Sequence, residues 1–101
     1  MDRKMMQQLQ QMQTKLVKAQ EELGKTDVEG TAGGGAVKVV MNGHRELRTL
    51  TIAQDAVDPE DVETLQDMIV AAFNDASKKA QDLSEQKLGG LTGGMNIPGL
   101  F

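Results

Sequence analysis

Apolar residues recur at every third or fourth position along residues 3–23, and this spacing predicts an amphipathic helix. We call this stripe the apolar seam. Its residues are Met5, Leu9, Met12, Leu16, Ala19 and Leu23. Spacings that alternate between four and three are typical of a helix that packs along another helix. Gly24 follows the seam directly, and we expect it to end the helix.

A second, polar strip runs beside the seam, one position before each apolar residue. Its residues are Lys4, Gln8, Gln11, Lys15, Lys18 and Glu22, and Lys25 continues the same spacing. Most of these side chains are hydrogen-bond donors, so the strip has two interpretations. It either flanks a helix pair as ordinary polar surface, or it contacts phosphate groups.

Residues 36–52 have a strand-like pattern instead of a helical one. They contain two runs that are rich in β-branched and apolar residues, and the two runs together predict a β-hairpin. Asn42 and Gly43 lie between the two runs. This dipeptide is a strong hairpin signal because both residues tolerate positive φ. We therefore expect the turn at this dipeptide, with Gly43 at positive φ.

The rest of the predicted sheet comes from the return strand and from the segment before the hairpin. Along the return strand, Leu47 has an odd number, whereas Leu50 and Ile52 have even numbers. In a regular strand they would therefore lie on opposite faces, and this change of parity predicts a β-bulge near Arg48 or Thr49. Residues 28–31 predict a short strand, and the glycines at 33–35 predict a turn or bulge that joins it to the hairpin. No Gly-Lys-Ser/Thr follows these glycines, which argues against a phosphate-binding loop. The result is a three-stranded antiparallel sheet.

Helical periodicity returns over residues 59–88 and predicts a second long helix. Asp58 can cap its N-terminus, and Pro59 suits the first helical position. Gly89 and Gly90 are expected to stop it. The apolar face of this helix holds Val62, Leu65, Ile69, Ala72, Phe73, Ala76, Ala80 and Leu83.

The second helix is too long for the sheet that it would cover. Thirty helical residues span about 45 Å, whereas seven-residue strands span about 23 Å. Much of the helix should therefore overhang the sheet. Asn74, in its middle, is a poor helix former, and we expect it to pack or hydrogen-bond onto the hairpin.

Composition supports one small domain that pairs with a second copy. The chain has 101 residues, no cysteine and two aromatic side chains, so its core is small and a dimer is expected. Residues 1–88 form the predicted domain, and residues 89–101 form a glycine-rich tail without regular structure. We find neither a signal-peptide pattern nor a membrane span, and we expect a soluble cytoplasmic protein.

Charge and candidate chemistry argue against an enzyme. The net charge is −4, but residues 1–25 are net basic, so nucleic acid could bind only through a local basic face. Ser77 and Ser84 have no histidine partner in the sequence pattern. The single histidine, His44, is expected to be a solvated turn residue without a metal or catalytic role. We predict no cofactor and no small-molecule substrate.

Three stretches together carry a family resemblance that covers nearly the whole chain. They are MQQLQQMQTKLVKAQEEL, VEGTAGGGAVKVVMNG and VETLQDMIVAAFNDASKKAQDL, followed by a tail of Gly, Met and Pro. This order closely resembles the YbaB/EbfC family of bacterial nucleoid-associated proteins. The resemblance implies an α+β subunit of order α-β-β-β-α, and a tweezer-like homodimer whose helical arms project from a shared sheet.

The resemblance also implies a function and a site. Family members bind duplex DNA in the nucleoid, organise the chromosome and, in some cases, regulate genes. The family's DNA surface lies on the helices, which maps here onto Arg3, Lys4, Lys15, Lys18, Lys78, Lys79 and Lys87. An alternative function is a dimeric protein-interaction module, in which the apolar seam and the tail dock another protein and the charges only keep the protein soluble.

Overall fold

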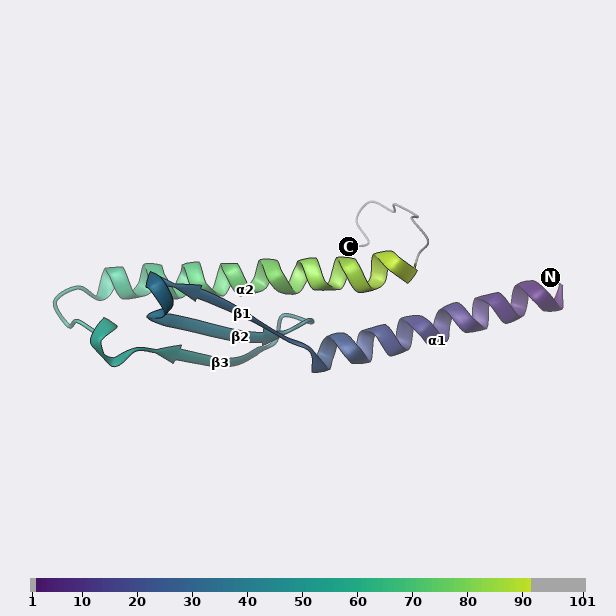
Figure 1. Cartoon of the computed structure of the whole chain (residues 1–101), viewed down its shortest axis with the longest axis horizontal. Helices are drawn as coiled ribbons and strands as arrows, with labels where there is room; N and C mark the ends of the chain where they lie inside the picture. Colours follow the sequence, from purple (N-terminus) through teal and green to yellow (C-terminus); the bar gives the residue numbers. More distant parts are fainter. Residues whose placement is uncertain (1, 92–101) are drawn as a thin grey trace.

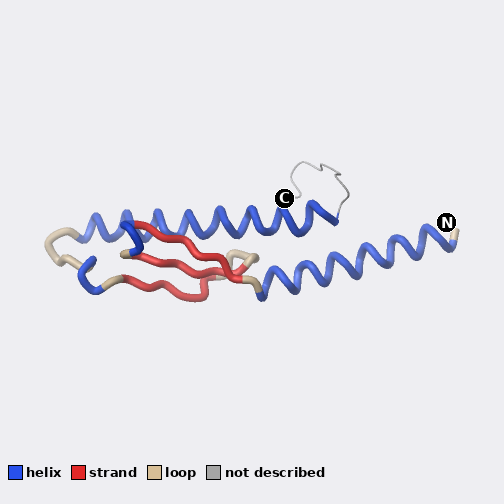
Figure 2. Tube along the Cα trace, in the orientation of Figure 1, coloured by secondary structure: helices blue, strands red, loops and turns tan. Residues whose placement is uncertain are grey.

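The computed structural model describes residues 2–91 and confirms the predicted α+β class and element order (Figure 1). A long helix precedes a three-stranded sheet, and a second long helix follows it. The elements are α1 (Arg3–Lys25), β1 (Asp27–Ala32), β2 (Val37–Asn42), β3 (Leu47–Ile52) and α2 (Val62–Leu91), with the 3₁₀ turns η1 (Gly33–Gly35) and η2 (Gln54–Ala56). The molecule measures 69 × 24 × 15 Å, because α1 extends away from the sheet (Figure 2).

The sheet is antiparallel, with β2 in the centre and β1 and β3 on its two edges. Val40 pairs with Thr49, and Met41 pairs with Leu47. Arg48 is therefore the extra residue of a β-bulge, which confirms the prediction from parity. In Figure 1, α2 lies along one face of the sheet. It packs against β1 and β2.

The core lies between β2 and α2. Its fully buried residues are Val37, Val39, Met41, Ala72, Ala76 and Ala80. The alanines let α2 come very close to β1, and Gly30 marks the point of contact. A Cβ at Gly30 would overlap the carbonyl oxygen of Ala72 and the backbone nitrogen of Ala76. Glycine is required here by space rather than by φ.

The hairpin turn is longer than the sequence predicted. Residues 43–46 connect β2 to β3, and the non-glycine residue with positive φ is Arg45, at 63°. Gly43 does not adopt positive φ, so that prediction is wrong. Gly43 is instead buried against α1, where a Cβ would lie 2.7 Å from the carbonyl oxygen of Leu23.

The start of α2 also differs from the prediction. The helix begins at Val62 rather than Pro59, and Asp61 caps it in place of Asp58. Asp61 accepts hydrogen bonds from the Thr64 hydroxyl at 2.6 Å and the Thr64 backbone nitrogen at 3.3 Å. These two bonds lower the pKa of Asp61 from its ordinary value of 3.8. Asp58 accepts instead from the Glu60 backbone nitrogen at 2.9 Å, which forms a turn before the helix.

Both helices run further than their glycines suggested. α2 continues through Gly89 and Gly90 to Leu91, since glycine lowers helix propensity by only about 1 kcal/mol per residue. α1 passes Gly24 and ends at Lys25, where the Thr26 hydroxyl donates to the Glu22 carbonyl oxygen at 2.7 Å. The remaining part of the predicted tail, residues 92–101, lies outside the described residues.

Asn74 does not contact the sheet as predicted, because its side chain is exposed. The neighbouring Asp75 makes the contact instead. Its carboxylate accepts a hydrogen bond from the Thr31 backbone nitrogen at 3.1 Å. This bond, more than the nearby lysines, lowers the pKa of Asp75. The carboxylate thereby satisfies a donor on the outer edge of β1.

Candidate nucleic-acid interface

α1 is attached to the rest of the molecule only at its C-terminal end. Ala19 and Leu23 are its buried residues, whereas the side chains of residues 3–15 are all exposed. Figure 1 shows this exposed part extending beyond the sheet. At 1.5 Å per residue, α1 is about 35 Å long. It is therefore an arm, anchored at one end and open on all sides at the other.

The hairpin turn holds the base of this arm by capping its last carbonyl groups. Helix C-termini leave carbonyl oxygens without helical donors. The Gly43 nitrogen donates to the Leu23 oxygen at 2.8 Å. The Asn42 amide and the Arg48 guanidinium donate to the Gly24 oxygen at 3.1 and 2.7 Å. We call Asn42, Gly43, His44 and Arg48 the C-terminal clamp.

His44 belongs to the clamp, although the sequence predicted only a solvated turn residue. Its side chain is exposed as expected, but its Nε2 lies 2.8 Å from the carbonyl oxygen of Gln20. A carbonyl oxygen only accepts, so Nε2 carries the hydrogen. The ring also lies against Gly24, where a Cβ would come within 3.3 Å of it. His44 thus ties the turn to the last turns of α1.

Asn42 is the centre of the clamp, and sequence reasoning missed this role. It is the buried polar residue of the described chain, at 1% exposure. Its Oδ1 accepts from the backbone nitrogens of His44 and Glu46, both at 3.0 Å. Its Nδ2 also donates to the Glu46 carboxylate at 2.8 Å. The Asn-Gly dipeptide pointed to a turn, but nothing local indicated a contact with residue 24.

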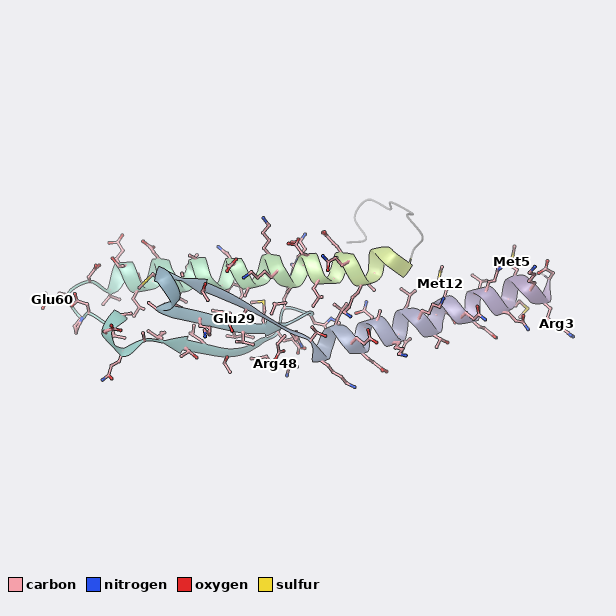
Figure 3. All side chains as sticks on the ribbon, viewed as in Figure 1. Arg3, Met5, Met12, Glu29, Arg48 and Glu60 are labelled. Carbon is pink, nitrogen blue, oxygen red and sulfur yellow. The ribbon has the colours of Figure 1, made fainter. Side chains whose placement is uncertain are left out.

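The seven predicted DNA-contacting residues separate into three groups. Arg3 and Lys4 are exposed at the free end of α1, where Figure 3 labels Arg3. Lys15, Lys18 and Lys87 line one hollow between α1 and α2. The third group, Lys78 and Lys79, lies on α2 over the sheet. The structure therefore brings three of the seven residues together.

Two of the predicted residues already have partners within the protein. Lys79 donates to the Glu29 carbonyl oxygen at 2.9 Å and lies 3.4 Å from the Asp75 carboxylate. Lys87 lies 3.3 Å from the Glu22 carboxylate. These contacts join α2 to β1 and to α1. Both lysines thus have a structural role that the sequence pattern did not reveal.

The exposed side of α1 also carries neutral hydrogen-bond donors, which a search for cations alone overlooks. Two shallow hollows there are lined partly by Gln7, Gln10, Gln11, Gln13 and Thr14. Amide and hydroxyl groups of this kind are regular partners of phosphate oxygens. The glutamine run of residues 7–13 was the sequence signal for this surface.

Among residues 2–91, three other kinds of site are not found. No three histidine or acidic side chains come together in a way that could hold a metal ion. No helix there is long and apolar enough to cross a membrane. No side-chain nitrogen or oxygen buried in this part of the chain lacks a hydrogen-bond partner.

The fold and the arm define a small α+β protein that presents hydrogen-bond donors and cations on a projecting helix. A family model described as the YbaB/EbfC DNA-binding family matches residues 1–95. The chain belongs to this family, as its sequence resemblance indicated.

Relatives and a solved structure agree with this assignment. A "Nucleoid-associated protein" of Pelotomaculum thermopropionicum is 60% identical over 97% of this chain and 93% of its own length. One of Chloroflexus aurantiacus is 58% identical over 98% of this chain and 97% of its own length. The crystal structure of an uncharacterized Helicobacter pylori protein matches with a TM-score of 0.78 at 27% identity, covering 91% of this chain and 98% of that one.

Proposed function

We propose that this protein is a nucleoid-associated protein that binds duplex DNA as a homodimer, mainly through phosphate contacts from α1. One observation carries the proposal: α1 projects from the sheet with Arg3, Lys4, Lys15 and Lys18 exposed along it. Cations and amides on an open helix can follow a phosphate backbone without reading base edges. Binding should therefore tolerate many sequences and depend steeply on salt. Roles in chromosome organisation and in gene regulation follow from such binding.

The hollow between the helices supports Lys15 and Lys18 as the central contacts. Lys87 shares this hollow and neutralises Glu22 at 3.3 Å. A phosphate near Lys15 and Lys18 would then meet less repulsion from that carboxylate. Lys87 and Lys79 act through the internal pairs that they form, whereas Lys78 is exposed on α2 and supplies an accessory contact.

Charge reversal at Lys18 tests the DNA proposal. Lys18→Glu should weaken binding of a labelled duplex at low salt by about tenfold or more, because each phosphate contact adds to affinity. In a homodimer the change occurs twice, so the slope of log affinity against log salt should fall in magnitude by about two. Fluorescence anisotropy at several salt concentrations measures both quantities.

Lys38→Glu is the matched control, since it makes the same charge change on β2, where Lys38 lies 3.6 Å from Glu29. We expect its affinity to stay within about threefold of the wild type, because it touches no phosphate. Equal losses for the two variants would show that net charge, and not the arm, determines binding. A wild-type slope near zero would exclude phosphate contacts altogether.

The homodimer proposal rests on apolar side chains that α2 leaves uncovered. Val39 pairs with Leu50 and Met41 with Leu47, so both leucines lie on the α2 side of the sheet. α2 packs over β1 and β2 instead of β3, and Leu47, Leu50 and Phe73 are 42–53% exposed. We call these three residues the open face.

The position of Phe73 on α2 completes this face. Asp75 and Lys79 point towards β1, and helical geometry places Phe73 on the opposite side of the axis, towards β3. Exposed apolar patches of this kind mark protein interfaces. A second copy can cover the face through a two-fold axis, because each subunit offers the same surface.

Leu50→Asp should convert the dimer to monomer. A buried carboxylate without a partner is costly at an interface, and we expect the dimer dissociation constant to rise about a hundredfold or more, equal to ~3 kcal/mol. Val17→Asp is the control, since Val17 is 60% exposed on α1, away from the open face. Sedimentation analysis across protein concentrations measures both. A Leu50→Asp protein that remains dimeric would place the interface elsewhere.

A protein-interaction module is the second candidate, favoured by the exposed outer part of the apolar seam. Met5, Leu9 and Met12 are 39–53% exposed, although apolar side chains in this spacing usually meet another helix. The salt titration separates the two candidates. A module of this kind would show duplex affinity that is weak at every salt concentration.

A further inference from the structure

The hairpin turn contains a chemically labile dipeptide at the place where the base of α1 contacts it. Asparagine is a thermolabile residue, and Asn42 is the one asparagine of the sequence that precedes a glycine. In such a dipeptide the backbone nitrogen of the glycine can attack the side-chain carbon of the asparagine, because glycine has no Cβ to hinder the approach. Asn42 and Gly43 therefore combine a structural role in the clamp with a capacity to react.

The reaction is a deamidation that needs only a base and water. The base removes the proton of the Gly43 nitrogen, the nitrogen bonds to Cγ of Asn42, and the bond between Cγ and Nδ2 breaks. Nδ2 takes up a proton and leaves as ammonia, so a five-membered succinimide ring remains. Water then opens the ring at one of its two carbonyl groups and leaves aspartate or isoaspartate. Nothing is oxidised or reduced.

The docked α1 blocks the first step of this reaction. The Gly43 nitrogen donates its hydrogen to the Leu23 carbonyl oxygen at 2.8 Å. Removing that proton would break the hydrogen bond and leave an anion beside a helix C-terminus, whose partial charge is negative. The Asn42 amide is held as well, because its Nδ2 donates to the Gly24 carbonyl oxygen at 3.1 Å. Both restraints come from α1, and both end when α1 leaves the turn.

The turn itself favours the reaction once α1 has left. Oδ1 of Asn42 accepts hydrogen bonds from the backbone nitrogens of His44 and Glu46, both at 3.0 Å. Backbone bonds between Asn42 and Glu46, at 3.1 Å, and between Arg45 and Asn42, at 3.0 Å, close the turn without α1. Fixed donors of this kind stabilise negative charge that develops on a carbonyl oxygen. Thus α1 controls the attacking nitrogen, whereas the turn activates the carbon.

We propose that Asn42 and Gly43 form a deamidation site that becomes reactive when the base of α1 undocks. Ala19 and Leu23 are the buried residues of α1, so the helix has a small anchor. A helix anchored in this way opens locally at a lower cost in free energy than unfolding of the whole molecule. The site is a property of the clamp, and it holds whether or not DNA is the ligand.

The aspartate product would keep α1 undocked. At present Nδ2 of Asn42 lies 3.1 Å from the Gly24 carbonyl oxygen and 2.8 Å from the Glu46 carboxylate, and it donates to both. A carboxylate oxygen in its place would face two acceptors and could donate to neither. Deamidation therefore converts a brief opening of the arm into a permanent one.

Peptide mapping by mass spectrometry tests the site in the full-length protein during incubation in mildly alkaline buffer. Leu23→Ala should speed deamidation of Asn42 about tenfold or more, because truncating a buried leucine weakens the anchor of α1. Val37→Ala is the matched control, since Val37 is buried between β2 and α2, at the other end of β2 from Asn42. It weakens the fold but leaves the anchor intact, so its rate should stay within about threefold of the wild type.

His44→Ala is a milder variant that leaves the core unchanged and decides the test if Leu23→Ala does not fold. It removes the contact of Nε2 with the Gln20 carbonyl oxygen at 2.8 Å and should speed deamidation about threefold. Equal rates for His44→Ala and the wild type would overturn the proposal. Equal acceleration by Leu23→Ala and Val37→Ala would also overturn it, because the reaction would then follow unfolding of the whole molecule.

Asn42→Asp tests whether the product keeps the arm open. Hydrogen exchange of the amides in residues 19–25 should become about tenfold faster than in the wild type, because the bonds from Nδ2 are lost. Exchange at the wild-type rate would show that the product leaves α1 docked, and would overturn the permanent opening.

Discussion

Gly30→Ala should lower the free energy of unfolding by about 3 kcal/mol or more, because overpacking against rigid backbone is among the costliest substitutions. The added Cβ would overlap backbone atoms of Ala72 and Ala76. These atoms cannot rotate away as a side chain can, so α2 would have to move off β1. Denaturant unfolding followed by circular dichroism, at one fixed protein concentration, measures the loss.

Gly89→Ala provides the comparison for this prediction. Gly89 is helical, and a Cβ there meets nothing within 4 Å. Alanine should therefore raise stability slightly, by up to ~1 kcal/mol from helix propensity. If Gly30→Ala changed the free energy of unfolding as little as Gly89→Ala, this result would contradict the close contact between α2 and β1.

Asn42→Leu should cost about 3 kcal/mol and loosen the base of α1. Leucine has a similar size but leaves the backbone nitrogens of His44 and Glu46 without the oxygen that they now contact. Unpaired polar groups in a buried site cost about 1–3 kcal/mol each. Denaturant unfolding gives the total loss, and hydrogen exchange of the amides in residues 19–25 reports the base of α1.

Asn74→Leu is the corresponding control, since Asn74 is exposed on α2. A surface substitution of this kind should stay within about 0.5 kcal/mol of the wild type. The Asn42 variant should also bind duplex DNA more weakly, because the arm would no longer have a fixed direction. Faster exchange spread evenly over the sheet, without any excess at residues 19–25, would contradict the clamp.

The sequence pattern predicted the parts of the fold that depend on local periodicity. The apolar seam and the parity change near Arg48 correspond to α1 and to the β-bulge. The residues at which helices begin and end were harder to predict from the sequence. Asp58 and Asp61 can both cap a helix, and only the two Thr64 hydrogen bonds decide for Asp61.

Contacts between distant residues could not be predicted. Asn42 and Gly24 are 18 residues apart, and no local signal connects them. The same limit applies to the lysines, because the sequence shows their charge but not the partners of Lys79 and Lys87. Glycine inside a strand often marks a close backbone approach, but the sequence did not show that Gly30 meets α2 at Ala72 and Ala76.

Attachment at one end makes α1 a lever. Arg3 lies about 30 Å from the base, so a tilt of 10° there would move it by about 5 Å. That displacement exceeds the rise of about 3.4 Å per phosphate of one strand along the axis of duplex DNA. In the proposed homodimer, the stiffness of a few hydrogen bonds at Gly24 and Leu23 would therefore set how widely the two arms open, and with it the duplex shapes that they accommodate.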